Sequence, residues 1–497
     1  MGGEPLDVST SRARASACLA AAIAAILTSC SGEARRAAQP AALDLKIGTF
    51  VGLSGGLANL LTREGLVAVD WDGRPLFRLA DAARESADGS ALVFRLRPNV
   101  RFHSGEIVTV EDVRQSLLTK SELTSDVTDI QVGLDTITIR LKRPHSLKLV
   151  DLSEFTIYDD ERLDRRTGPF KIVSLDPKVV LEPFADYHQG APSAGRIEMA
   201  EYPTHRAAWT AMMRGEIDFL HEVNRDAIEF VQAGGDIQAY QLLRPYYVPL
   251  VFNLAHPVLR NPQVRLALSE AIDREEIVQN AMRGHGRVAE GPFWPHHWAY
   301  TSTQRSAFRP DVAKLRLESA GLPMRPARKG VAPSRFSITC LIPEGDVRFE
   351  RIALTVQRQL LAIGVDLRLE PVPQVAFLER AKEGEFDAFL FEMVSSRTLR
   401  FAHELWHSAR TPLRTGYTAA DDALDRMKLA RTDAEIRAAV MEVMRVLHAD
   451  PPAAFLAWPR EVRAADDTLE IPYQQDHDVL GTLWQVRPNI TAAGHRR

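Results

Sequence analysis

The sequence has few cysteines, no surplus of positive charge and no apolar run long enough to cross a bilayer. Only three cysteines occur in 497 residues, and Cys18 and Cys30 both lie near the amino end, so a disulfide framework is excluded. Lysine and arginine number 61 against 65 acidic residues, and this balance argues against a nucleic-acid-binding surface. The apolar run from Cys18 to Leu27 has about ten residues, whereas a transmembrane helix needs roughly twenty.

What is present at the amino end is typical of an export signal. Arg12 and Arg14 precede the apolar run, which predicts a signal peptide over residues 1–29. The segment LTSC that ends at Cys30 resembles the bacterial lipobox, and the resemblance implies that Cys30 is lipidated; an ordinary cleaved signal with an incidental Cys30 is the alternative. Residues 30–42 lack periodicity and are expected to form a tether. We therefore expect a periplasmic or extracytoplasmic protein that is lipid-anchored to a bacterial membrane.

Hydrophobic periodicity predicts an α/β fold with more than one lobe. Alternating apolar residues predict strands at 43–50, 92–96, 137–141 and 365–369. Capping patterns predict helices after Thr109 and after Asp273. A helical stripe over residues 352–360 is expected to end at Gly364. Cys340 lies in an apolar strand and is expected to be a buried, unreactive residue.

Several short segments carry a resemblance when they are taken in order. They are Glu64-Gly65-Leu66, Asp72-Gly73, SADG at 86–89, VRFHSG at 100–105, TGPF at 167–170, FN at 252–253 followed by NPQVRLALSEAIDREEIV, and EGEFDAFLF. This ordered set resembles the extracellular solute-binding proteins of ABC importers in the peptide/nickel family, family 5. The resemblance covers nearly all of residues 43–465. Most of these residues are expected to hold the fold.

The resemblance implies a periplasmic-binding-protein-like type II fold, in which two lobes joined by hinge strands carry an additional small N-terminal α+β domain. It implies a first lobe over 43–58, 168–253 and 463–497, a small domain over 59–167, and a second lobe over 254–462. It also implies a binding lipoprotein without enzymatic activity or cofactor, which closes over a small solute and delivers it to ABC permease and ATPase subunits. We expect a monomer that does not bind nucleic acid. A receptor diverged to signalling or chaperone work is a further hypothesis.

The resemblance places the first candidate ligand residues at the crossing between the lobes. Tyr246, Tyr247, Phe252 and Asn253 are expected beside the cleft, because aromatic side chains bury a large area at little rotamer cost. For the three aromatics, ordinary interdomain core is the alternative.

The second group of candidates follows the G-x-FD strand. Peptide-binding members usually carry there an acid that pairs with the peptide amine, and this chain lacks it. Glu392, Ser395, Arg397 and Arg400 occupy the region instead. A guanidinium suits a carboxylate or phosphate, and hydroxyls suit sugars or amides. The expected ligand is a peptide or peptide-like solute, with sugars, opines or metal chelates as alternatives, and a solvated surface position for the two arginines also remains open.

The segment His403-Glu404-Leu405-Trp406-His407 fits the H-E-x-x-H pattern of zinc-dependent hydrolases. Pro412 would end the helix soon afterwards, and residues 426–428 offer no third carboxylate. We therefore expect packing or cleft lining, and His403 and His407 are only weak metal candidates. Trp406 is expected near a bound solute. Residues 295–298, PHHW, are expected to form an exposed aromatic loop.

Overall fold

The computed structural model describes residues 43–120, 126–143, 149–159, 161–224, 228, 235–301, 307–326 and 333–489. The predicted signal peptide, Cys30 and the tether lie outside these residues. The remaining chain, from Leu43 onward, is one compact unit. No helix in the described ranges is long and apolar enough to cross a membrane.

The first lobe is built around β1 (Leu43–Phe50), whose two neighbouring strands are both parallel to it. β1 pairs in parallel with β12 and β13, and its alternating residues Leu45 and Ile47 are buried as the sequence predicts. The other elements of this lobe are α2 (Ser54–Thr62), β10 (Phe170–Ser174), β11 (Val179–Pro183), β12 (Ala194–Tyr202), α5 (His205–Met213), β13 (Phe219–Leu220) and β14 (Ile237–Leu243).

The small domain has its own hydrophobic core, which extends from Leu66 to Ile157. Its main sheet has the order β5-β6-β8-β7, and α3 packs on it. α3 begins at the predicted capping box, in which Thr109 and Asp112 exchange both hydrogen bonds. The elements are β2 (Glu64–Gly65), β3 (Val67–Val69), β4 (Pro75–Phe77), β5 (Ala80–Glu85), β6 (Ala91–Leu96), α3 (Val110–Leu118), β7 (Val127–Val132), β8 (Thr136–Leu141), the 3₁₀ helix η1 (Leu149–Glu154) and β9 (Thr156–Ile157).

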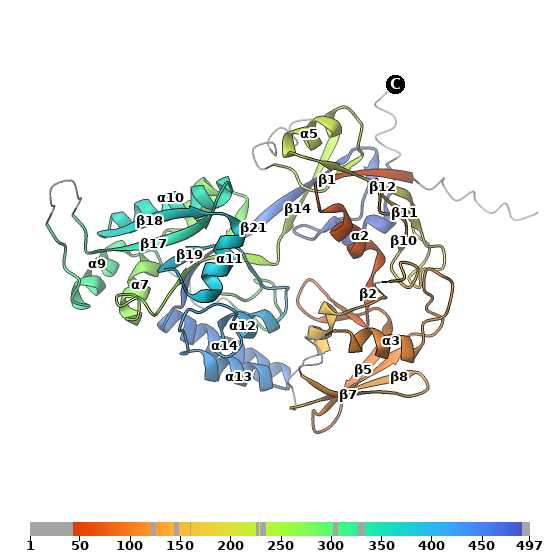
Figure 1. The fold of residues 1–497 in the computed structure, drawn as a ribbon, viewed down its shortest axis with the longest axis horizontal. Coiled ribbons are helices and arrows are strands. Elements are labelled where there is room, and N and C mark those ends of the chain that lie inside the picture. Colours follow the sequence, from red (N-terminus) through yellow and green to blue (C-terminus); the bar gives the residue numbers. More distant parts are fainter. Residues whose placement is uncertain are drawn as a thin grey trace, which may run out of the picture. The chain divides into compact units, whose positions relative to one another are not determined.

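The second lobe alternates strands and helices around two large apolar clusters. Its first part contains β15 (Tyr246–Phe252), α7 (Pro262–Glu270), α8 (Arg274–Glu276), the π-helical turn η3 (Ile277–Ala281), β16 (Gly286–Val288) and α9 (Pro310–Ser319). Its second part contains β17 (Phe336–Pro343), α10 (Val347–Leu361), β18 (Val365–Val372), α11 (Gln374–Glu383), β19 (Ala388–Leu390), β20 (Met393–Val394), α12 (Arg400–Trp406), α13 (Asp421–Leu429) and α14 (Asp433–Ala449). α12, α13 and α14 lie together along one side of the lobe, where α13 packs against both α12 and α14 (Figure 1).

One long strand, β21 (Ala453–Asp466), belongs to both lobes. Its first half pairs with β15 and β16, and its second half pairs with β13 and β14. The figure shows β14 and β21 running together between the two groups of elements (Figure 1). The chain ends with β22 (Leu469–Glu470), the 3₁₀ turns η4 (Val479–Gly481) and η5 (Leu483–Gln485), and β23 (Arg487–Pro488). β15, at the predicted crossing, and β21 therefore belong to one continuous sheet, whereas the predicted domain boundaries stay predictions.

Candidate functional site

The candidate site centres on the loop that joins β20 to α12. Ser396 and Arg397 adopt φ angles of 54° and 60°, in the left-handed region that side chains disfavour. The backbone N–H groups of Ser395 and Ser396 hold the loop in place by donating to the carbonyl oxygen of Pro245, at 2.8 and 3.3 Å. Strained backbone persists only where the surrounding structure holds it in place, and it is often found at ligand-binding sites.

Arg397 brings a guanidinium to this loop. None of the ion pairs between described residues includes Arg397, and its Nε has no hydrogen-bond partner among them. Burial lowers the pKa of Arg397, while the charges of Asp478, Asp70 and Glu154 raise it. A guanidinium remains protonated under these conditions. The half-buried side chain is therefore a cation whose Nε has no hydrogen-bond partner among the described residues.

The small domain reaches the same loop through η1. Burial raises the pKa of Glu154, and a hydrogen bond from the hydroxyl of Ser396 opposes that shift. The Oγ of Ser395, which is 1% exposed, has no hydrogen-bond partner within the described ranges. Hydroxyl, guanidinium and carboxylate groups from two parts of the chain thus meet at the loop.

Aromatic side chains from three distant segments meet around Trp71. Its ring stacks on that of His477 with centroids 4.1 Å apart, and it meets Trp294 edge to face at 4.9 Å. The Nε1 of Trp294 donates to the carbonyl oxygen of Trp71 at 2.8 Å. His296 lies 5.2 Å away from the same ring, between centroids. This contact joins the small domain, the second lobe and the carboxyl-terminal segment.

Gly73 permits the close approach of the small domain to the second lobe. Its φ of +82° suits glycine, and an added Cβ would lie 2.4 Å from Cδ2 of His297 and 2.8 Å from the carbonyl oxygen of Arg397. Nearby, Arg74 pairs with Asp433 at 2.7 Å. A cavity of about 290 Å³ lies beside this contact, with walls from both the small domain and the second lobe.

A network of ion pairs occupies the crossing between the lobes. Arg244 donates to both carboxylate oxygens of Glu392, at 3.1 and 2.9 Å, and lies 3.1 Å from Glu461. Arg348 approaches Glu392 to 3.9 Å. Burial raises the pKa of Glu461, and Arg244 opposes that shift. Glu392, which the sequence offered as an anionic partner for a ligand, is thus engaged with arginine.

The structure separates the predicted aromatic residues into accessible and buried positions. Tyr246 is half-buried and lies under the guanidinium of Arg244, 4.5 Å from the ring centroid. Tyr247 is fully buried, and its hydroxyl accepts a hydrogen bond from Nε1 of Trp406 at 2.9 Å. Trp406 is itself only 3% exposed. Phe252 lies in the core of the second lobe. These buried positions match the packing role that the sequence left open for the aromatic residues.

Two further candidates, Asn253 and Arg400, make contacts that join separate parts of the fold. The Nδ2 of Asn253 donates to the carbonyl oxygens of Gly384 and Phe386, at 3.0 and 2.7 Å. The guanidinium carbon of Arg400 lies 5.4 Å from the ring centroid of Phe155, and this contact joins α12 to the small domain. Ser395, Arg397 and Arg400 therefore come together around the loop, whereas Phe252 and Asn253 lie in the interior of the second lobe.

One sequence expectation is wrong, and one sequence observation was too narrow. The loop at 295–298 is not simply exposed, because His297 is 3% exposed and packs against Gly73. Residues 426–428 offer no carboxylate, but Asp425, directly before them, does approach the H-E-x-x-H histidines: it lies 3.1 Å from His403 Nε2 and 3.3 Å from His407 Nε2.

Sequence reasoning also missed several residues of the site. Asp70, Trp71, Glu154, His477 and Asp478 were not predicted. Only Asp72-Gly73 of the acidic and aromatic run VDWDG, residues 69–73, contributed to the family resemblance. The run QDHD at 475–478 could have indicated a binding site, since acidic and imidazole groups cluster there. Asp478 now pairs with Arg463 at 2.6 Å.

Comparison with known proteins gives a consistent result. The family described as bacterial extracellular solute-binding proteins, family 5 Middle, matches residues 74–410. The oligopeptide-binding protein AppA of Bacillus subtilis is 24% identical over 440 residues, which cover 79% of this chain and 80% of that protein. The structure of that AppA in complex with a nonapeptide superimposes with a TM-score of 0.70 at 21% identity, covering 90% of this chain and 98% of the other. NikA from Brucella suis in complex with Fe(III)-EDTA gives a TM-score of 0.77 at 18% identity, with coverage of 90% and 100%. These structures confirm the predicted α/β fold.

Proposed function

Because the chain belongs to the bacterial extracellular solute-binding proteins of family 5, we propose that it captures a peptide or peptide-like solute through a carboxylate and delivers it unaltered to the permease of an ABC importer. The family consists of non-enzymatic binding proteins of ABC transporters that work outside the cytoplasm. The H-E-x-x-H motif therefore does not make this chain a zinc-dependent hydrolase.

The class of solute has to be argued from this chain, because its relatives differ in what they hold. Their structures contain ligands as different as a nonapeptide and Fe(III)-EDTA. The single observation that carries the proposal is the guanidinium of the half-buried Arg397, which has no ion pair among the described residues and an unpartnered, buried Nε. A carboxylate is the natural partner of a planar guanidinium, since two parallel N–H groups can donate to its two oxygens.

The surroundings of Arg397 suit a solute that also carries an amine or amide. Asp70 and Glu154 come from the small domain, and Asp478 comes from the carboxyl-terminal segment. Ser395 adds a hydroxyl that has no partner among the described residues. A solute that contacts several of these segments at once stabilises the arrangement in which they meet, and it does so by its differential affinity for that arrangement.

The strands that cross between the lobes support movement of the lobes around such a solute. β14 leads into β15 through Arg244 and Pro245, and β21 runs back beside both strands. Pro245 also holds the site loop through its carbonyl oxygen. The crossing and the loop at Ser395 and Ser396 are therefore in direct contact.

Thermal denaturation with three random tripeptide mixtures tests the proposal. The mixtures carry free termini, acetylated amino ends or amidated carboxyl ends. We expect the free and acetylated mixtures to raise the melting temperature, because both retain the carboxylate and bind only the folded protein. The amidated mixture should have little effect. Equal stabilisation by the amidated mixture, or its loss on acetylation alone, would contradict recognition through a carboxylate.

The membrane anchor is a separate part of the proposal. We propose that Cys30 carries the lipid that holds the protein at a bacterial membrane, which the lipobox-like segment LTSC supports. Labelled fatty acid should be incorporated into the wild-type chain in bacterial cells and not into Cys30→Ser. Equal labelling of the two proteins would show that Cys30 is not the modified residue.

A further inference from the structure

Two histidines and an aspartate gather between α12 and α13, apart from the residues proposed to hold the solute. His403 lies in the last turn of α12, and His407, four residues later, is the residue that follows the end of the helix. Their rings stack with centroids 4.7 Å apart and planes inclined by 28°. Asp425 projects from α13, and its Oδ1 faces Nε2 of both rings.

The spacing of these atoms matches the edges of a metal coordination polyhedron. Nitrogen and oxygen ligands lie about 2.0–2.1 Å from Zn²⁺, and tetrahedral geometry then sets neighbouring ligand atoms about 3.3 Å apart. The Oδ1 of Asp425 lies 3.1 Å from Nε2 of His403 and 3.3 Å from Nε2 of His407. One ligand atom from each of the three residues falls within 4.8 Å of the others. Only a small adjustment of the two rings is needed to surround an ion.

We propose that His403, His407 and Asp425 form a binding site for a divalent transition-metal ion, with Zn²⁺ as the ion that the donor set suits best. Two imidazoles and a carboxylate are typical zinc ligands, and water completes the fourth position. The aspartate is 56% exposed, so an ion can enter from solvent. This site is independent of the proposed solute site.

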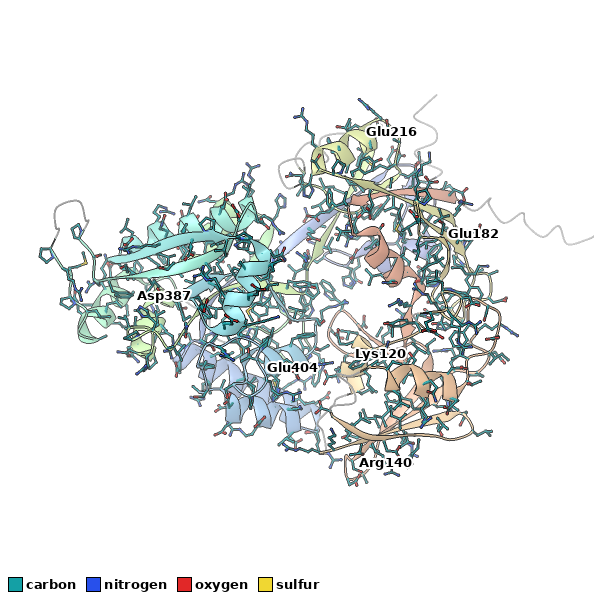
Figure 2. The ribbon with its side chains drawn as sticks, viewed as in Figure 1. Lys120, Arg140, Glu182, Glu216, Asp387 and Glu404 are labelled. Carbon is teal, nitrogen blue, oxygen red and sulfur yellow. The ribbon has the colours of Figure 1, made fainter. Side chains whose placement is uncertain are left out.

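The role of the proposed metal ion is structural and not catalytic. Glu404, the residue that would activate water in a hydrolase, accepts a hydrogen bond from Nη2 of Arg410 at 3.1 Å. It lies on α12 (Figure 2). A bound ion would connect α12 to α13 and so brace the helix that directly follows the Ser395–Arg397 loop.

The hydrogen bonds of the ring nitrogens set the expected strength. Zinc-binding histidines usually donate the other ring N–H to an acceptor, and losing that acceptor weakens binding about 10- to 100-fold. Here Nδ1 of His403 has no partner among the described residues, and Nδ1 of His407 accepts from the N–H of Ala409. That local contact in the turn after α12 must open when Nε2 binds the ion. We therefore expect weaker binding than at a closed structural zinc site.

Calorimetric titration of the full chain with ZnCl₂ tests the site, after dialysis against EDTA and then into chelator-free buffer. We expect one equivalent of Zn²⁺ in the wild-type protein and at least about tenfold weaker binding in His407→Ala and Asp425→Ala. Glu404→Gln is the matched control, because it keeps the three ligands and changes only the motif glutamate. Arg397→Ala should also bind Zn²⁺ normally, which separates this site from the solute site.

Titration with Co²⁺ provides a second readout, in which tetrahedral coordination gives visible absorption bands that Asp425→Ala should lose. Because Asp425 is largely exposed, its replacement leaves the fold intact, so this variant decides the question even where His407→Ala fails to fold. No stoichiometric binding by the wild-type protein, or equal binding by Asp425→Ala, would overturn the proposal.

Discussion

Replacing Arg397 by alanine should weaken solute binding far more than it changes the stability of the free protein. A hydrogen bond to a charged group contributes about 1.5–3 kcal/mol. With two N–H groups facing one carboxylate in a water-poor site, we expect a loss of about 2–3 kcal/mol, which is a weakening of about 30- to 150-fold.

The stability of the unliganded variant separates a binding effect from a folding effect. Arg397 has no ion pair among the described residues, and burial disfavours its charged form. Removing it deletes no ion pair among the described residues, and the desolvation cost that it relieves offsets the lost attraction of Asp478, Asp70 and Glu154. We expect the free energy of unfolding of Arg397→Ala to lie within about 1 kcal/mol of that of the wild type.

The assay is a thermal-shift titration with the free tripeptide mixture, in which the ligand concentration for a given shift reports the apparent affinity. Arg368→Ala is the matched control, because Arg368 is an exposed arginine of the same lobe that pairs only with Asp366 among the described ion pairs. It should titrate as the wild type does. An unchanged affinity in Arg397→Ala would refute the assignment of this guanidinium to the solute.

Three further predictions concern the fold around the site. Gly73→Ala should destabilise the protein by about 1–3 kcal/mol in urea denaturation, through backbone strain and the clash with the neighbouring lobe. Gly105 shares the positive φ, but an added Cβ there meets no neighbour within 4 Å, so Gly105→Ala should destabilise the protein less. Equal losses of stability in the two variants would contradict the clash. Trp406→Ala should lower the free energy of unfolding by about 3–5 kcal/mol, and a loss below about 1 kcal/mol would show that this side chain is not core. Burial lowers the pKa of His221 to about 3 and that of His103 to about 4. The free energy of unfolding should therefore fall as the pH drops from about 6.5 toward 4, by about 1.4 kcal/mol per pH unit for each histidine. His103→Asn should remove one of these two contributions from urea titrations across that range.

Local features of the fold were predictable because neighbouring residues determine them. The strand at 43–50 and the capping box at Thr109 form as the sequence predicts. The helix stop at Gly364 forms with a φ of +83°, and Cys340 is fully buried. Each of these depends on periodicity, a turn or a cap within a few residues.

The candidate site was only partly predictable, because its contacts join distant segments. Arg397 and Ser395 stood out as departures from the family pattern. The burial of Tyr247 and Trp406 depends on the packing of β15 against α12, which no local pattern reveals. The approach of Asp425 to His403 depends likewise on how α13 packs beside α12.

Native mass spectrometry of the full chain with the free tripeptide mixture tests the central claim most directly. We predict one bound tripeptide per chain, released at its original mass, with bound signal much reduced in Arg397→Ala. The absence of any bound tripeptide, or the appearance of hydrolysed products with purified protein, would contradict the account.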